Sequence, residues 1–491
     1  MIRDSSKKTS SNSQGSENEA LAVGLPLSPA SEAFAEILLC EIALKNRDRF
    51  TIVWNILSAH YNSRLTYRPS RGGEDADKEH QSEAIKLTPG IEKCVTGILR
   101  LCVWTSNRNM IANQVLPTLN ILHPPLGALI WSPLELNLDK HLAEGLWKIC
   151  RNVDGLTQVD TEGWGGILGL AEWCATRGGL RSDQLGSLAD DDPSLQAFRS
   201  LHLILHAVEL KDSLQVYRWP HIVRSVRCLV EAGERGHCPK LSIAGLDLLQ
   251  VLHTRTESLA TNDGGSQHLL NCWVPILEAI SEPAEKSKNG SVRQQAISLL
   301  TDTLLDRHGS RVPVDSGLCS IMNTISIPLA GKRITDLLRI PYDDVQNDLE
   351  ETMIELELCI SLLFKPFLHH LKALVSVKEE FVGIWISMLG IMTQLLGEEA
   401  PARNEEDNAA VREGVVTREK LFLTTKELGS EHLRNAVMVL AAMGVLIDDV
   451  DDSKSDEQLE FSSVTWSALR SIGYCKPFLE DWKSNCSESS V

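Results

Sequence analysis

The chain has 491 residues and a formal net charge of −18 at pH 7, with 43% hydrophobic but only 5% aromatic residues. This length exceeds what a single hydrophobic core can serve, so the chain must form several domains or a quasi-linear repeat. The acidic balance disfavours a nucleic-acid-binding protein and electrostatic adhesion to an anionic membrane, because both require concentrated Lys and Arg.

The cysteines and the polar N-terminus bear on the cellular compartment. Twelve cysteines are scattered without closely paired spacing, which is typical of reduced, buried thiols in a cytosolic protein. The N-terminal residues lack an apolar core, and no stretch reaches about 18 uninterrupted apolar residues. We therefore expect neither a signal peptide nor a transmembrane helix.

A helix hairpin is predicted to follow a disordered tail, residues 1–29. Ser31 is placed to cap the first helix and Asn46 to cap the second, with Asp48 in the first turn of the second. Apolar residues recur every three or four positions on one face of each helix. They are Phe34, Ile37, Leu38 and Ile42, then Phe50, Val53, Trp54, Leu57 and Tyr61. We expect these two faces to pack on each other.

Helical patterns of the same kind continue along the chain. They cover residues 89–102, 107–122, 138–149, 164–174, 195–208, 219–234, 241–259, 269–280, 292–305, 318–329, 344–374, 381–396, 428–446 and 464–482. Asp192-Pro193 supplies a cap and a first-turn proline. Pro117 is expected to kink or shorten its helix, and Pro366 to interrupt the longest pattern.

The helix pairs recur at roughly 45 to 60 residues, a loose period near or above that of HEAT and armadillo arrays. Their starts lie near Ser31, Pro89, Asn137, Asp192, Leu241 and Ser291. Because no strand alternation occurs, we predict an all-α fold, an irregular helical-repeat (HEAT/armadillo-like) α-α superhelix. We divide the chain into the tail, a solenoid (30–397), an acidic linker (398–415), C-terminal helices (416–483) and a frayed tail (484–491).

Motifs that could carry chemistry are incomplete. The glycine-rich run 163–169 follows no strand, so close helix packing explains it better than a dinucleotide loop. Residues 330–333 lack most of a phosphate loop. Cys228, His237 and Cys238 could supply three zinc ligands, but structural zinc needs four. We nominate no catalytic, cofactor-binding or metal-binding residue and expect no cofactor.

Four residues on one predicted helix form the best candidate for a binding surface. Arg218, His221, Arg224 and Arg227 follow the three-residue helical period. They could form a basic ridge for an acidic partner or a phosphoinositide head group. The alternative is a solvated helix face whose cations pair with nearby Glu231 and Glu234.

Several segments resemble the helical region downstream of the catalytic domain in the large Golgi-type Arf guanine-nucleotide exchange factors, the brefeldin-A-resistance class. The longest begins at Cys40 and runs through Asn46-Arg47-Asp48-Arg49-Phe50 to Val53-Trp54. The others are Gly97 to Leu101, Gln114 to Leu119, Ala143 to Leu146, Trp164 to Leu168, Leu433 to Leu440, and Thr465-Trp466-Ser467. The resemblance covers most of residues 31–483.

The resemblance implies a non-catalytic regulatory or membrane-recruitment region of an exchange factor acting in Golgi vesicle transport. The expected partners are proteins, with Arf or Rab family GTPases and Golgi membrane factors as candidates, and no nucleic acid. The expected location is cytoplasmic, peripheral to Golgi membranes. No segment matches the family's exchange domain, so we expect no enzyme activity from this chain alone. It would be a fragment, a split gene model or a paralogue without that domain. The alternative function is a free-standing helical-repeat scaffold or transport adaptor that binds protein partners.

Overall fold

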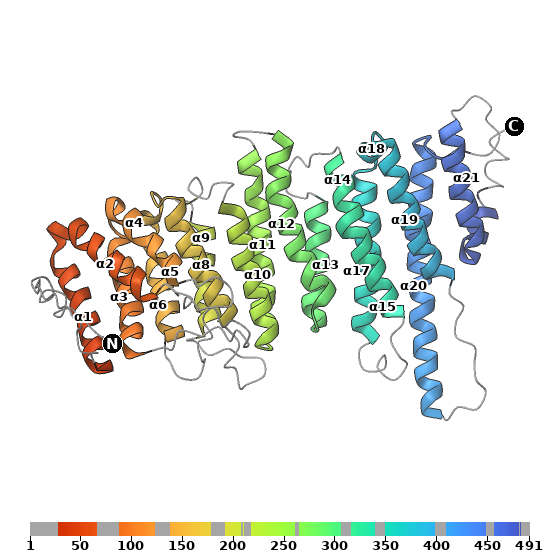
Figure 1. Ribbon diagram of the computed structural model, residues 1–491. Coiled ribbons are helices and arrows are strands. Elements are labelled where there is room, and N and C mark those ends of the chain that lie inside the picture. The colour runs from red at the N-terminus through yellow and green to blue at the C-terminus, as the bar shows by residue number, and fades with distance from the viewer. Residues whose placement is uncertain are drawn as a thin grey trace, which may run out of the picture.

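A computed structural model describes residues 28–65, 88–122, 138–177, 192–207, 210, 218–260, 265–305, 316–338, 349–397, 409–447, 456–480 and 482. Every regular element in these ranges is a helix, and no strand occurs in them. The all-α helical-repeat prediction is confirmed, because helices of one array pack side by side along the whole described chain (Figure 1).

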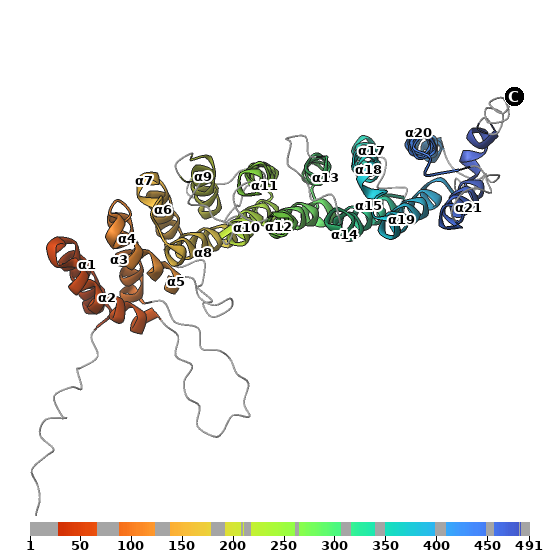
Figure 2. The ribbon, with the colours of Figure 1, turned by 90° about the horizontal axis from the view of Figure 1, so that it is seen from above.

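The helices form two layers, and in each layer a helix contacts the next one along the array. The first layer is α1 (Pro29–Lys45), α3 (Pro89–Thr105), α6 (Leu138–Cys150), α9 (Pro193–His206), α11 (Pro239–Ala260), α13 (Gly290–Leu304), α17 (Leu349–His369) and α20 (Ala409–Ala442). The second layer is α2 (Phe50–Leu65), α4 (Asn109–Val115), η2 (Leu116–Thr118), α5 (Leu119–Leu122), α8 (Thr161–Arg177), α10 (Trp219–Arg235), α12 (Gly265–Lys286), α14 (Ser316–Ile321), η5 (Met322–Ser326), α15 (Ile327–Leu338), α19 (Lys378–Gly397) and α21 (Asp456–Ser471). Figure 2 shows the two rows from above.

Four short helices connect or follow these helices in the chain: η1 (Arg47–Arg49), α7 (Val153–Leu156), α18 (Leu371–Leu374) and η6 (Gly473–Cys475). Most of the buried side chains join one continuous core that runs the length of the array. Tryptophan recurs at the centre of the second layer. Trp164, Trp219, Trp273 and Trp385 are fully buried in α8, α10, α12 and α19. The core is therefore a continuous layer of contacts between neighbouring helices rather than one globular centre.

Capping side chains set where several helices begin. The Asp192 carboxylate accepts a hydrogen bond from the Ser194 amide at 2.8 Å, and Pro193 follows it in the first turn, as predicted. The first helix begins earlier than expected, because Ser28 caps it rather than Ser31. Asn46 does not cap α2. It ends α1, where its side-chain amide donates to the Ile42 carbonyl at 2.7 Å.

Glycines in α8 allow a close approach between repeats. A Cβ atom on Gly166 would lie 2.7 Å from the carbonyl oxygen of Leu116 in η2. No larger residue fits without moving the backbone of the neighbouring repeat. The interpretation of the run 163–169 as a packing motif is confirmed, because all of it lies inside the helix α8.

The predicted packing face of α1 is wrong. Glu36, Cys40 and Ala43 are the residues that α1 buries, and its main neighbour is α3 rather than α2. The predicted apolar residues Phe34, Ile37, Leu38 and Ile42 are exposed. The spacing misled because α1 is apolar on both sides, so its periodicity does not say which side faces the core. On α2 the prediction holds for Phe50, Trp54, Leu57 and Tyr61, which are buried.

Prolines perturb the helices less uniformly than predicted. Pro117 lies in η2, which separates α4 from α5, so the predicted shortening is confirmed. Pro366 lies inside α17 and does not interrupt it; the helix continues to His369. The α14–α15 pair is joined through a π-helical turn, η5, which the sequence pattern did not reveal.

Two features concern the C-terminal part. α20 begins at Ala409, so its first turns fall within residues 398–415, which the sequence pattern assigned to a linker; residues 398–408 lie outside the described residues.

α19 is long and apolar enough to cross a membrane by length and composition alone. However, it buries Trp385, whose indole nitrogen donates to the Thr465 hydroxyl of α21 at 3.0 Å. We interpret α19 as a core helix.

Candidate functional site

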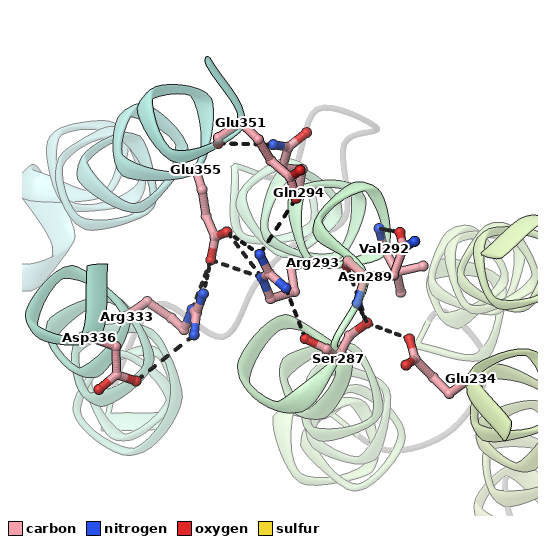
Figure 3. A network of polar contacts seen from close by, with 10 residues as sticks. All are labelled: Glu234, Ser287, Asn289, Val292, Arg293, Gln294, Arg333, Asp336, Glu351 and Glu355. Atoms are coloured by element: carbon pink, nitrogen blue, oxygen red, sulfur yellow. Dashed lines mark hydrogen bonds and ion pairs between the residues drawn. The ribbon is translucent and has the colours of Figure 1, made fainter. Parts of the chain in front are cut away.

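A buried carboxylate holds two arginines from neighbouring helices near the centre of the array (Figure 3). Glu355 of α17 has a side chain that is only 1% exposed. Arg293 of α13 donates from Nε to its two oxygens at 3.2 and 3.0 Å. Arg333 of α15 donates from Nε at 2.8 Å and makes a second contact through Nη2. The carboxylate therefore joins three helices from both layers.

Further polar contacts extend this network in both directions. Arg293 Nη1 donates to the Ser287 carbonyl at 3.0 Å, and the Ser287 hydroxyl donates to Glu234 of α10. On the other side, the Gln294 amide donates to the Glu351 carbonyl at 3.1 Å. Figure 3 shows these residues as one chain of contacts from α10 to α17. We call the set Glu234, Ser287, Arg293, Gln294, Arg333, Glu351 and Glu355 the polar seam.

The polar seam has the chemistry of a structural network. Charge-assisted, forked contacts between guanidinium and carboxylate groups give geometric specificity. A buried carboxylate that engages two arginines has few lone pairs left for a substrate. The seam also contains no cysteine or histidine that could act as a nucleophile or base. It therefore fixes how neighbouring repeats pack.

The polar seam was not predicted from the sequence, although the sequence carries a signal for it. Glu355 and Arg293 are charged residues within helices whose other inward positions are mostly apolar and carry no other buried charge. Such interruptions are costly unless the charges are paired. The partners come from distant parts of the sequence, so the pairing could not be deduced from spacing.

The predicted ridge on α10 is partly exposed. His221, Arg224 and Arg227 lie on the surface at three-residue intervals. Arg218 does not join them, because it is only 5% exposed. Its guanidinium lies 5.4 Å from the ring centroid of Trp164 and donates to the Val159 carbonyl at 3.2 Å. Arg218 precedes the first turn of α10 and turns toward α8 rather than continuing the row.

The two surface arginines of the ridge are paired with carboxylates. Arg224 lies 3.7 Å from Glu172 of α8. Arg227 contacts Glu231 at 3.3 Å and Glu282 of α12 at 2.5 Å. Each cation therefore faces an acidic group from its own or a neighbouring helix. An acidic partner would have to compete with these carboxylates, so the ridge remains a prediction.

The residues considered for zinc do not form a site. Cys228 and Cys238 are buried, and burial raises the pKa of the Cys228 thiol to about 12. His237, next to Cys238, has a positive φ of 49° at the turn after α10. Within the described residues, no group of three or more His, Cys, Asp or Glu side chains could hold a metal ion.

A small pocket lies between α20 and the segment after α21. Its volume is about 260 Å³, and its lining includes Glu431, Arg434, Cys475 and Phe478. Arg434 packs 5.6 Å from the ring centroid of Phe478. Burial raises the pKa of Cys475 to about 11, which leaves its thiol protonated and a poor nucleophile at neutral pH. The pocket shows no arrangement of acid, base and nucleophile.

Comparison with known proteins identifies the kind of array. Residues 273–473 match the family model of the GBF1-like tetratricopeptide repeat region. Over 469 residues, 90% of this chain, the sequence is 21% identical to the ARF guanine-nucleotide exchange factor GNL1 of Arabidopsis thaliana. The chain spans 27% of the length of that relative. The resemblance to the helical region of Arf exchange factors is thus confirmed: residues 273–473 are similar to the GBF1-like region, and most of the chain is similar to part of GNL1.

Proposed function

We propose, on the premise of its GBF1-like helical region, that this chain is the non-catalytic regulatory and membrane-recruitment part of an Arf guanine-nucleotide exchange factor in Golgi vesicle transport. The observation that carries the proposal is the family match at residues 273–473. This segment contains most of the polar seam and the last helices of the array.

The geometry supports a binding role rather than catalysis. The described helices give a long, continuous surface, and stacked repeats of this kind use such surfaces to bind other proteins. In the described part of the chain we find no convergent set of acid, base and nucleophile. We therefore propose that any exchange activity comes from a separate domain, and that this chain contributes protein contacts at cytoplasmic, Golgi-peripheral sites.

Two measurements on the purified and tagged full chain test the proposal. Alone, the chain should not accelerate release of a fluorescent nucleotide from loaded Arf above the spontaneous rate. In cells, the tagged chain should concentrate on Golgi membranes. Nucleotide release at catalytic amounts of the chain would contradict the first expectation. A uniformly cytosolic distribution would contradict the second and favour the scaffold alternative.

A matched pair of variants examines whether the ridge takes part in recruitment. The double variant Arg224→Glu, Arg227→Glu reverses the charge at the two surface arginines of α10. Arg100→Glu with Lys148→Glu makes the same charge change elsewhere, at cations that are also exposed and each paired with one glutamate. If the ridge binds the Golgi partner, the first variant loses Golgi association and the second keeps it. Equal behaviour of the two variants would remove the ridge from the proposal.

A further inference from the structure

Three successive turns of the array carry exposed cations. They lie where α1 leads into η1 and α2, where α3 leads into α4, and where α6 leads into α7. The exposed cations are Lys45, Arg47 and Arg49 in the first turn, Arg108 in the second and Arg151 in the third. We call these residues the basic edge. They stand out in a chain whose net charge is −18.

Packing joins the three turns into one edge. Phe50, at the first turn, has its ring centroid 5.1 Å from that of Trp104 in α3. The Arg108 guanidinium of the second turn covers the same Trp104 ring at 4.3 Å. Between the second and third turns, the Asn152 side-chain amide donates to the Ser106 hydroxyl at 2.6 Å, and α4 contacts α7 (Figure 2). The cations of successive turns therefore follow one another along the array.

The basic edge is not neutralised by ion pairs within the described chain. No carboxylate of the described residues lies within 4.0 Å of any cation of the edge. Other cations of the same helices differ, because Arg100 contacts Glu41 at 2.6 Å and Lys148 contacts Glu144 at 2.7 Å. Two exposed carboxylates, Asp48 and Asp154, belong to the three turns and leave the edge with an excess of positive charge.

The helix macrodipole accounts for part of this arrangement. The edge follows the C-terminal ends of α1, α3 and α6, where cations are stabilised by the partial negative charge of the last carbonyl groups. This stabilisation does not use up the guanidinium donors. Arg47 donates from Nε to the Leu44 carbonyl at 3.4 Å, and Arg108 lies on a ring that accepts no N–H···O bond. Most of the N–H donors on the edge therefore remain available to an anionic ligand.

We propose that the basic edge binds an extended acidic segment of a partner protein, with a carboxylate at every third residue. Helices that pack side by side are about 8–10 Å apart, so successive turns present their cations at about that interval. Three residues of an extended chain span about 10 Å. A segment that runs along the edge can therefore offer one carboxylate to each turn. Arginine suits this role, since its planar guanidinium binds a carboxylate through two parallel hydrogen bonds.

The linear arrangement favours a peptide over other anionic ligands. A phosphorylated lipid head group is bound best where several cations converge on one point, whereas these cations are distributed over three turns. Single-stranded nucleic acid is bound by a series of open aromatic rings on which bases stack. The one aromatic ring beside these cations that is not fully buried, Trp104, is already covered by Arg108. The proposal rests on the proposed role of the chain in protein contacts and adds the chemistry of one contact.

Fluorescence anisotropy of a labelled peptide of repeated Glu-Gly-Ser units, titrated with the full chain, tests the proposal. The double variant Arg49→Glu, Arg108→Glu should weaken binding by about tenfold or more in Kd. The control variant Arg100→Glu, Lys148→Glu makes the same charge change at exposed cations of the same repeats that already have carboxylate partners. It should change Kd by less than about threefold. Equal losses in the two variants would mean that only net charge matters, which overturns the proposal.

A second double variant separates binding from folding. Arg47→Glu with Arg151→Glu changes the first and third turns at side chains that cover no aromatic ring, so the Trp104 packing stays intact. Circular dichroism of all variants should match that of the unaltered chain. This variant should also weaken peptide binding by about tenfold. Unchanged binding would show that the ligand does not span the three turns.

A peptide with the same residues, but with all glutamates grouped at one end, tests the spacing. It should bind at least about fivefold more weakly than the regular peptide, because it cannot reach all three turns at once. Equal binding of the two peptides, or no binding at the highest soluble concentration of the chain, overturns the proposal. So does binding to vesicles of phosphatidylcholine and phosphatidylserine through these cations without any binding of the peptide. None of these assays uses Arf or Golgi membranes, so a chain that binds the peptide but does not reach the Golgi contradicts the proposed function alone.

Discussion

Glu355→Gln is the sharpest test of what the polar seam contributes. The change keeps the shape of the side chain but removes its charge and replaces one acceptor oxygen by a donor. Arg293 and Arg333, whose side chains are 16% and 13% exposed, then face a neutral amide that cannot satisfy both. Removing one partner of a buried ion pair costs about 3–5 kcal/mol.

The structure places the expected loss at the low end of that range. Arg293 keeps its contact with the Ser287 carbonyl and a weaker one with Glu351 at 3.6 Å. Arg333 keeps Asp336 at 3.9 Å. We therefore expect Glu355→Gln to lower the free energy of unfolding of the central repeats by about 3 kcal/mol. Amide hydrogen exchange should show faster exchange in α13, α15 and α17, with α1 and α3 unaffected.

Glu144→Gln is the matched control, because Glu144 forms an exposed pair with Lys148 at 2.7 Å on the surface of α6. Exposed pairs of this kind contribute less than about 1 kcal/mol. If urea unfolding and hydrogen exchange report the same small effect for both variants, the arginines relax into water without cost. The seam would then not hold the repeats together.

Three further predictions concern other parts of the array. Trp54→Ala should destabilise the N-terminal repeats by about 3–5 kcal/mol, because it empties a buried site and removes the 3.0 Å bond to the Gln114 carbonyl; unchanged hydrogen exchange there would contradict the expected burial. Burial raises the pKa of the Cys40 thiol to about 11 and of the Cys102 thiol to about 12. In the unfolded chain a thiol ionises near pH 8.5. The stability that comes from burying these two neutral thiols is therefore fully present below pH 8.5 and is lost as the pH rises through the folded pKa values. The free energy of unfolding should therefore fall as pH rises from 9 to 11. In a Cys486→Ser chain, a thiol reagent at pH 8 should modify Cys40 and Cys102 only after denaturation. Burial against Phe364 lowers the pKa of His432, so its contribution is present above the unfolded value of about 6.5 and is lost as pH falls through the folded pKa; a His432→Phe chain should show a weaker acid dependence in urea titrations.

The helices and their order could be predicted from the sequence, because apolar periodicity and capping residues act over a few positions. Asp192-Pro193 started α9 as expected, and Phe50, Trp54, Leu57 and Tyr61 mark the buried side of α2. Local signals of this kind depend only on neighbouring residues.

The sequence was a poorer guide to which side of a helix faces the core and to which helix it packs against. α1 is apolar on both sides, so Phe34 and Leu38 were assigned to the core although they are exposed. The polar seam was not predicted for a related reason. Arg293 lies 62 residues from Glu355 in sequence, and only the stacking of repeats brings the two together. The charged pairing of the ridge was foreseen in part, since Arg227 does contact Glu231.

The two-layer stacking has a mechanical consequence. Each helix touches mainly its immediate neighbours, and α1 and α20 lie at opposite ends of the first layer among the described residues (Figure 1). A partner bound at one end can affect the other end only through small rotations between neighbouring repeats, which add up along the array. The chain would then respond to binding by changing its curvature. Because the polar seam joins successive repeats near the middle, we expect that stretch to be the stiffest and the bending to concentrate on either side of it.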